Sequence, residues 1–374
     1  MVYRILVASY TDAIYTLAFD PAKSKDAALS LSSTLEVGHH PSWIERHPSD
    51  SSIIFTGLEQ ADGRLLTLKY DLNNGEGKVL SNVSSGGADP CSILATNSNV
   101  FVANYSSGTV AIYSLPSVHS PSGLKEAQLP LQFSGNGPCT ERQGSSHPHQ
   151  VYFSKPNSPT SLGPVEEVLV PDLGSDKIWR LRKDTDGKWE IKDEITFDKH
   201  QGGGPRHIVV YDSNLYTLLE LTNTVVVHDF KSSNEKPSYV TSARLSMPEG
   251  LAPLTMLAAE ILSQPPSTKY PSPYLYVSNR NDPRPHGDLI SIFSPLKEGA
   301  TELEHVADVS TGLAHVRGFL FFGPDDRYII VGGANGGGVK VFERVDEGRN
   351  LKEVAHLPVN DTGAGLAPTT FLCL

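Results

Sequence analysis

The chain has 374 residues and a formal net charge of −11 at pH 7, and 39% of its residues are hydrophobic. Its 32 glycines and 27 prolines argue against long helices, coiled coil and collagen. No apolar run approaches the ~18 residues that cross a bilayer. Lysine and arginine form no run either, which disfavours nucleic acid and anionic membranes as partners. We therefore expect a soluble, turn-rich β protein.

The first residues, MVYRILVASYT, contain no long apolar stretch and no small-residue cleavage pattern, so they do not resemble a secretory signal. The three cysteines, Cys91, Cys139 and Cys373, are odd in number and widely spaced. They form neither a disulfide framework nor a zinc motif and suit a reducing compartment. We expect a cytoplasmic protein.

Short apolar triplets, each preceding a polar turn, recur along the chain. They are ILV ending at Val7, IIF at Phe55, VFV at Val102, VLV at Val170, LYT at Thr217, LYV at Val277 and IIV at Val331. Most are followed, across a turn rich in Gly, Asn, Asp or Ser, by a second β-branched run such as TVAIYSL or TVVVHDF. Each such pair predicts a β-hairpin.

A second series of strands, most of them opened by proline, interleaves with the first. Its members are PSWIERH from Pro41, PCSILAT from Pro90, PHQVYFS from Pro148, PRHIVVY from Pro205, PLTMLAA from Pro253, VRGFLFF from Val316 and PTTFLCL from Pro368. Each repeat unit thus holds an opening strand, a second strand and at least one more.

Seven units of about 53 residues and roughly four strands each predict an all-β, seven-bladed β-propeller. We expect residues 1–374 to form one such domain, with loop insertions near 116–146 and 262–272, where Pro, Ser and Gly accumulate. The chain begins with a second strand and ends with an opening strand. The two ends should therefore pair within one blade and close the ring.

Equivalent repeat positions should meet at the central channel, where a ligand can contact several blades at once. The residues after the opening proline or its equivalent are Ser42, Cys91, His149, Arg206, Leu254, Arg317 and Thr369. The residues that stand three positions after the end of each apolar triplet are Tyr10, Leu58, Tyr105, Leu173, Glu220, Arg280 and Ala334. The polar members His149, Arg206, Glu220 and Arg280 therefore predict one convergent cluster, and apart from Arg317 the register adds no further basic residue.

Two simpler interpretations of these residues stay open. Glu220 and Arg280 could form only a structural ion pair. His147 and His149, two residues apart, could bind a metal, although no Asp, Glu or His stands at a spacing that identifies it as a third ligand. We expect no metal and no cofactor.

The stretch GGGPR at 202–206 lacks the GK[ST] ending of a phosphate loop and suits a close turn. Arginines with a His and a Glu suit proton transfer on a bound anion.

Five segments resemble the lactonase family of seven-bladed propellers, in the family's order. They are SHPHQVYF (146–153), PDLGSDKIW (171–179), GGGPRHIVVY (202–211), LYTLLELTNTVVV (215–227) and LYVSNRN (275–281). That family includes 6-phosphogluconolactonases and 3-carboxy-cis,cis-muconate lactonizing enzymes, which are cycloisomerases. SHPHQ and GGGPRH are closer to the phosphogluconolactonase branch.

The resemblance implies lactone chemistry without metal, on a small anionic lactone or muconate-type substrate. Its site residues fall on His149, Arg206, Glu220 and Arg280, with the arginines binding the anion or oxyanion and His149 or Glu220 carrying the proton. Arg317, His147 and Tyr105 are further candidates for substrate binding. The alternatives are the cycloisomerase, a calcium-dependent gluconolactonase-like enzyme, and a non-catalytic interaction scaffold, as many propellers are.

Overall fold

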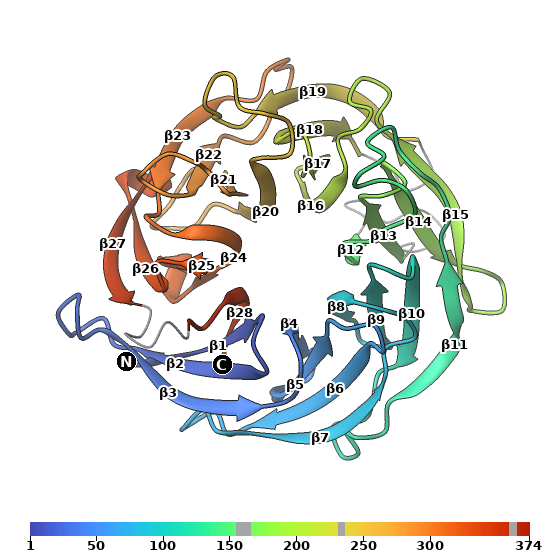
Figure 1. Cartoon of the computed structure of the whole chain (residues 1–374), viewed down its shortest axis with the longest axis horizontal. Coiled ribbons are helices and arrows are strands. Elements are labelled where there is room, and N and C mark those ends of the chain that lie inside the picture. The colour runs from blue at the N-terminus through green and yellow to red at the C-terminus, as the bar shows by residue number, and fades with distance from the viewer. Residues whose placement is uncertain (155–165, 231–235, 359–364) are drawn as a thin grey trace.

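The computed structural model describes residues 1–154, 166–230, 236–358 and 365–374. These residues form four-stranded antiparallel sheets that stand as seven blades around a central axis (Figure 1). The predicted seven-bladed β-propeller is therefore confirmed. Within the described ranges, no helix is long and apolar enough to cross a membrane.

The first three blades cover the N-terminal part of the chain and also take in its last strand. From the innermost strand outward, the first blade holds β28 (Pro368–Cys373), β1 (Tyr3–Ser9), β2 (Ala13–Phe19) and β3 (Leu29–Glu36). The second holds β4 (Pro41–His47), β5 (Asp50–Leu58), β6 (Arg64–Tyr70) and β7 (Gly77–Ser84). The third holds β8 (Pro90–Ala95), β9 (Asn99–Asn104), β10 (Thr109–Ser114) and β11 (Lys125–Gln132).

The remaining four blades follow in chain order. The fourth holds β12 (Tyr152–Ser154), β13 (Glu167–Asp172), β14 (Lys177–Lys183) and β15 (Trp189–Thr196). The fifth holds β16 (Pro205–Tyr211), β17 (Asn214–Leu219), β18 (Thr224–Asp229) and β19 (Ser238–Arg244). The sixth holds β20 (Leu257–Gln264), β21 (Tyr274–Arg280), β22 (Leu289–Phe293) and β23 (His305–Ser310). The seventh holds β24 (Ala314–Phe322), β25 (Tyr328–Gly336), β26 (Val339–Val345) and β27 (Asn350–Leu357), with 3₁₀ turns at Pro324–Asp326 and Asp346–Gly348.

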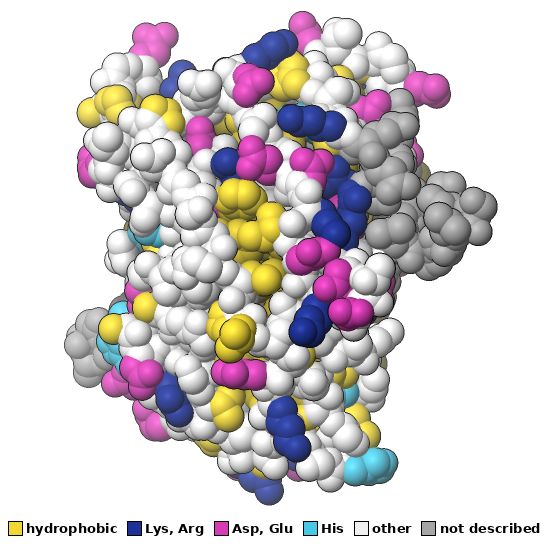
Figure 2. Space-filling model, turned by 90° about the vertical axis from the view of Figure 1, so that its right-hand side faces the viewer, with side chains coloured by type: hydrophobic (Ala, Val, Ile, Leu, Met, Phe, Trp, Pro, Cys, Tyr) yellow, Lys and Arg dark blue, Asp and Glu magenta, His cyan; other side chains and the backbone are white. Residues whose placement is uncertain are grey.

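Burial explains the hydrophobic pattern of the repeats. The second strands lie between neighbouring blades, and β13 and β21 are buried along their whole length. A strand covered on both faces needs a continuous apolar run, which is why the triplets recur. The outermost strands, such as β7 and β11, are largely exposed. On the outer side shown in Figure 2, acidic and basic side chains are interspersed around a band of hydrophobic ones.

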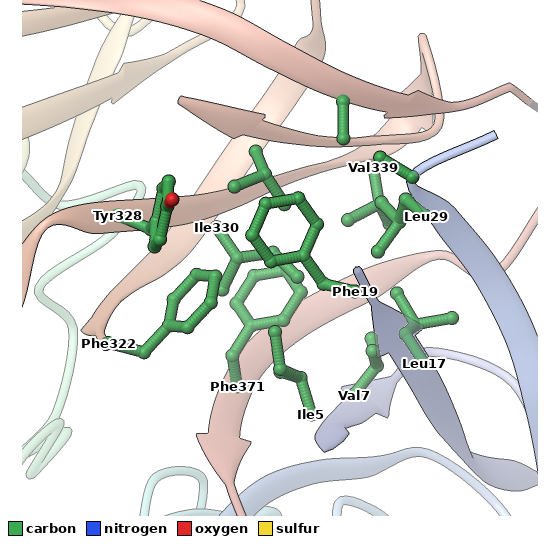
Figure 3. Close-up of a cluster of buried hydrophobic side chains, with 13 residues drawn as sticks. Ile5, Val7, Leu17, Phe19, Leu29, Phe322, Tyr328, Ile330, Val339 and Phe371 are labelled. Atoms are coloured by element: carbon green, nitrogen blue, oxygen red, sulfur yellow. The ribbon is translucent and has the colours of Figure 1, made fainter. Parts of the chain in front are cut away.

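The two ends of the chain close the ring, as the sequence predicts. Strand β28 pairs antiparallel with β1, with Ile5 opposite Cys373 and Val7 opposite Phe371. An apolar cluster then joins this blade to the seventh (Figure 3). In it, the Phe19 ring packs edge-on against Phe322 and Tyr328, at centroid distances of 5.7 and 5.1 Å.

Irregular pairing at the start of the innermost strands determines which side chains face the channel. In six blades the register to the second strand shifts there, as between Pro41 and Trp43 in β4. A β-bulge redirects the extra residue. The residues within these shifts that line the central cavity are Ser42, Cys91, Arg206, Glu260, Arg317 and Thr369.

The structure corrects three details of the predicted repeat. The innermost strand of the sixth blade begins at Leu257, not at Pro253, so its channel residue is Glu260 and not Leu254. The insertion expected near 116–146 contains β11, and that near 262–272 overlaps the end of β20. In the second blade, Leu58 pairs with Pro41 as Asn104 pairs with Pro90 in the third, so Glu59 and not Leu58 is the equivalent of Tyr105.

Candidate active site

The carboxylate of Glu220 is the centre of a buried charge cluster at the channel mouth. Glu220 directly follows β17, and its side chain is 1% exposed. Its Oε2 lies 2.7 Å from Arg280 Nη2 and 2.9 Å from Arg206 Nε, and its Oε1 lies 2.7 Å from Arg142 Nη2. Glu220 thus contacts three guanidinium groups, from β21, from β16 and from the segment between β11 and β12.

These arginines control the ionisation of Glu220. Burial alone would raise the pKa of its carboxyl, but Arg280, Arg206, Arg142 and Arg317 outweigh burial and lower the pKa to about 2. Glu220 is therefore a carboxylate at any ordinary pH. With its oxygens held by arginines, it is a poor acceptor for a further proton.

Arg206 and Arg280 are held from behind by the sixth blade. Arg206 Nη1 donates to the Ala259 carbonyl, and Arg280 Nη2 donates to the Ala258 carbonyl at 3.2 Å. The Nε–H groups of both arginines are buried and satisfy no hydrogen-bond geometry with described residues, although Arg206 Nε contacts Glu220. Both side chains keep donor capacity for an anionic ligand.

Arg317 lies in β24, in the seventh blade, and lines the same cavity as Arg206. Its guanidinium is 5.1 Å from the centre of the Tyr10 ring, a cation–π contact. Among the described side chains none forms an ion pair with it, unlike Arg206 and Arg280. Burial raises the pKa of Tyr10 to about 12 against the opposing effect of Arg317, so the tyrosine remains neutral. Arg317 is thus a cation whose charge is available to a ligand.

The segment before β12 contributes two histidines, which pack on Tyr105. The His147 ring stacks on Tyr105 at 4.4 Å between centroids, and its Nδ1 lies 3.0 Å from the Tyr105 carbonyl oxygen. His149 meets the same ring edge-on at 5.6 Å and is 6% exposed. Burial, with Arg206, His207, Arg317 and Arg280 nearby, lowers the pKa of His149 well below its usual value. His149 is therefore neutral around pH 7.

A second His–Glu pair lies in the channel and was not predicted from the sequence. His207 Nδ1 is 2.6 Å from Glu260 Oε1, and both side chains are buried. The His207 ring also contacts His149 edge-on at 5.3 Å and Trp43 at 5.7 Å. Burial and Arg206 lower the pKa of His207, while Glu260 opposes them.

The cavity beside this cluster is small, about 20 Å³, and is lined by His149, Arg206, His207, Glu260 and Arg317 but not by Glu220 or Arg280. It holds about one water molecule and no organic substrate. The glycines of GGGPR form no phosphate loop either, because the Asp176 carboxylate accepts hydrogen bonds from Gly202 N at 2.6 Å and Gly204 N at 2.9 Å.

The structure brings together all seven residues predicted from the sequence: His149, Arg206, Glu220, Arg280, Arg317, His147 and Tyr105. In the part of the chain that it describes, no three His, Cys, Asp or Glu side chains are placed to hold a metal ion.

The sequence prediction missed four polar residues of this cluster. Arg142 lies in a segment interpreted as an insertion and occupies no repeat position, so the register could not place it beside Glu220. Glu260 lies on a strand without an opening proline, and Glu59 is one place beyond the assumed register. His207 directly follows Arg206 in GGGPRH, and this adjacency was the signal that could have identified it.

Comparison with known proteins agrees with this architecture. The family model described as Lactonase, 7-bladed beta-propeller matches residues 4–364. A probable 6-phosphogluconolactonase of Arthroderma benhamiae is 28% identical over 344 residues, which is 90% of this chain and 81% of that protein. A 6-phosphogluconolactonase of Formosa agariphila is 24% identical over 96% of this chain and 98% of its own length.

A solved structure shows the same fold. The crystal structure of a putative 6-phosphogluconolactonase from Bacteroides uniformis superposes with a TM-score of 0.79 at 22% identity, covering 100% of this chain and 99% of the other. The match of the family model to nearly the whole chain, on a propeller with a convergent polar channel mouth, assigns the protein: it belongs to the lactonase family of seven-bladed β-propellers.

Proposed function

We propose that this protein hydrolyses a small anionic lactone of the 6-phosphogluconolactone type. Two curated relatives that align along most of this chain have the name 6-phosphogluconolactonase, one of them as probable. The observation that carries the proposal is the pairing of a neutral buried histidine, His149, with a cluster of arginines in which Arg317 has no described carboxylate partner.

The charges favour an anionic substrate. Although the chain as a whole has a net charge of −11, this cluster contains four arginines against the carboxylates of Glu59, Glu220 and Glu260. A guanidinium presents N–H groups that match carboxylate or phosphate oxygens in pairs. Arg317, together with the Arg280 Nε–H group that has no hydrogen-bond partner among the described residues, would bind the anionic group or the oxyanion.

The proton carrier in this proposal is His149 and not Glu220. Glu220 has a pKa of about 2 and is held by arginines, so its role is to fix Arg206 and Arg280 in place. His149 would take a proton from water as the water attacks the lactone carbonyl, and return it to the ring oxygen that leaves. The arginines would stabilise the negative charge on the carbonyl oxygen.

The substrate would lie at the channel mouth, above the small cavity. Beside His147 there is an open groove of about 450 Å³, lined by residues of the ranges 106–108, 132–136 and 144–146. Serine, asparagine, glutamine and glycine dominate this lining, and among the described residues no charged side chain belongs to it. Such a surface suits the hydroxyl groups of a sugar acid. His147 and Tyr105, stacked at the edge of the groove, would contact the substrate.

The test is turnover of three compounds in the presence of a chelator. We expect acid release from 6-phosphogluconolactone, at a higher kcat/KM than from uncharged gluconolactone. Chelator should not reduce the rate. Loss of ultraviolet absorbance from 3-carboxy-cis,cis-muconate would instead establish a cycloisomerase. If the parent turns over none of the three compounds, and the rates measured with Arg206→Ala do not differ from those of the parent, the protein is a scaffold or acts on another compound.

We further propose that the reaction takes place in the cytoplasm. Cys91, Cys139 and Cys373 are all free thiols in the structure, which suits a reducing compartment.

A further inference from the structure

Three buried polar atoms around the central cavity lack a hydrogen-bond partner among the described residues. They are Ser42 Oγ, His149 Nδ1 and His207 Nε2, and all three residues line the cavity of about 20 Å³. A buried polar atom without a partner costs about 1–3 kcal/mol. A cavity above ~10–15 Å³ accommodates one water molecule, which typically makes about three hydrogen bonds. The size of the cavity and the number of unpaired atoms both suit a single water.

We propose that this cavity binds one water molecule that links His149 to the His207–Glu260 pair, and that His207 and Glu260 are positioning residues that act through His149. The part of this inference that concerns catalysis rests on the lactone hydrolysis proposed above. The water site itself rests on the geometry of the cavity.

The hydrogen-bond directions follow from the Glu260 carboxylate. Its Oε1 accepts from Ile261 N at 3.0 Å and lies 2.6 Å from His207 Nδ1, so Nδ1 carries a proton and donates it. His207 Nε2 is then an acceptor, and the water donates to it and to Ser42 Oγ. The water in turn accepts from His149 Nδ1–H. This tautomer leaves His149 Nε2 with a free electron pair, as a base requires.

Electrostatics explain why such a link is useful. Arg206, Arg317 and Arg280, with His207 beside them, make a positive charge on His149 unfavourable. The Glu59 carboxylate lines the same cavity as both histidines. His207 in addition lies directly against a carboxylate, that of Glu260, which opposes the effect of Arg206 and Arg317 on it. A positive charge therefore costs less on His207 than on His149.

The proton transfers balance. As water attacks the lactone carbonyl, its proton bonds to His149 Nε2, and the proton on His149 Nδ1 passes to the cavity water. A proton of that water passes to His207 Nε2, whose positive charge then lies beside the Glu260 carboxylate. The reverse transfers return one proton from His149 Nε2 to the ring oxygen as its bond to the carbonyl carbon breaks. No other reactant is needed.

The kinetic test compares Glu260→Gln, Ser42→Ala and His207→Phe with the parent. Glu260→Gln retains an oxygen acceptor for His207 but removes the charge. For Glu260→Gln and His207→Phe we expect kcat to fall at least about tenfold with KM within about twofold, because general base catalysis contributes 10²–10⁴-fold. We also expect the acidic limb of the kcat profile to move. The matched control is His228→Asn, since His228 is a buried histidine of the same blade that does not line the cavity.

Purely structural roles would give a different result. If the variants fold with kcat and pH profile unchanged, or if their loss falls entirely in KM, the relay is wrong. Should His207→Phe fail to fold, Ser42→Ala decides: it removes one partner of the water without touching either histidine. We expect it to lower kcat about threefold or more, and an unchanged kcat in Ser42→Ala and Glu260→Gln overturns the proposal.

A spectroscopic test needs no substrate. In protein labelled with ¹⁵N-histidine, with the His149 signals identified by their loss in His149→Gln, we expect His149 to be neutral and protonated at Nδ1. The tautomer should change in Ser42→Ala and in His207→Phe but not in His228→Asn. Protonation of His149 at Nε2 in the parent would overturn the water link. A parent that shows the Nδ1 tautomer but hydrolyses no lactone would overturn the proposed function alone.

Discussion

Arg280 Nη2 lies 2.7 Å from Glu220 Oε2, and this contact joins the ends of the second strands of two adjacent blades. The same carboxylate also contacts Arg206 and Arg142. Glu220 therefore has a structural role, in holding the arginines together against their mutual repulsion, beside any role in binding a substrate. The structural ion pair that the sequence left open is therefore present, and a role of the same two residues in binding a substrate is part of the proposed function.

Glu220→Gln should destabilise the protein measurably while leaving the fold intact. The substitution keeps the shape but leaves buried guanidinium groups without their counter-charge, which costs about 3–5 kcal/mol. With an unfolding entropy of about 2.1 cal/mol/K per residue, that loss lowers the Tm by about 4–6 °C. Calorimetry measures it. The control is Glu194→Gln, which removes a partly exposed ion pair with Lys177 and should shift the Tm by no more than about 1 °C.

The effect of Glu220→Gln should depend on pH in a defined direction. The pKa of Glu220 is lowered from 4.5 to about 2 on folding. Its charge thus contributes stability that is fully present above pH 4.5 and is lost as the pH falls through 2. The difference in Tm between parent and variant should be largest above pH 5 and shrink between pH 4.5 and 2. A difference that stays constant across this range would mean that the ionised carboxylate is not its source.

Arg317→Ala should weaken the recognition of a charged substrate selectively. Because Arg317 has no ion-pair partner among the described residues, its removal takes no partner away from a buried carboxylate. We expect KM for 6-phosphogluconolactone to rise at least about tenfold, since a charge-assisted hydrogen bond contributes about 1.5–3 kcal/mol. KM for uncharged gluconolactone should change less than threefold. Equal losses on both substrates would contradict a role in binding the anion. The control is Arg349→Ala, which removes an exposed arginine paired with Glu347.

The activity should persist to unusually low pH for an enzyme with a histidine base. Burial and the surrounding arginines lower the pKa of His149 well below 6.5, so its neutral, proton-accepting form survives below that pH. We expect kcat/KM to be level from pH 7.5 to 6 and to fall only in more acidic solution. Initial rates corrected for spontaneous hydrolysis measure it. A fall of kcat/KM that already begins between pH 7 and 6.5 would contradict the assignment of His149 as the base.

The repeat made most of the fold predictable from the sequence. Because β9 and β25 are covered by neighbouring blades, their cores had to be continuous apolar runs, and such runs are visible without a structure. The closure by β28 followed from the phase of the repeat at the two ends. Prediction failed where the innermost strand lacks its opening proline, as in the sixth blade, where this strand begins at Leu257.

The polar cluster was predictable for the same reason and only to the same extent. His149, Arg206 and Arg317 occupy one repeat position, and the bulges of the innermost strands bring that position to the channel. Arg142 belongs to no repeat position. It reaches Glu220 from a connecting segment, and no local rule in the sequence places such a side chain 2.7 Å from a residue 78 positions away.

Phe371→Ala tests whether the terminal strand fastens the ring. Phe371 is 5% exposed and packs in the cluster between the first and seventh blades, together with Val7 and Ile330 (Figure 3). Removal of a buried phenylalanine ring costs about 3–5 kcal/mol. Because β28 joins the end of the chain to β1, we expect this loss to appear first as opening of the first blade, seen as faster amide exchange in β1 and β2 than in β17. Thr370→Ala, in the same strand with a half-buried side chain, should leave that exchange unchanged. Uniform acceleration of exchange in all blades would mean that the ring unfolds as one unit and that its closure point has no special role.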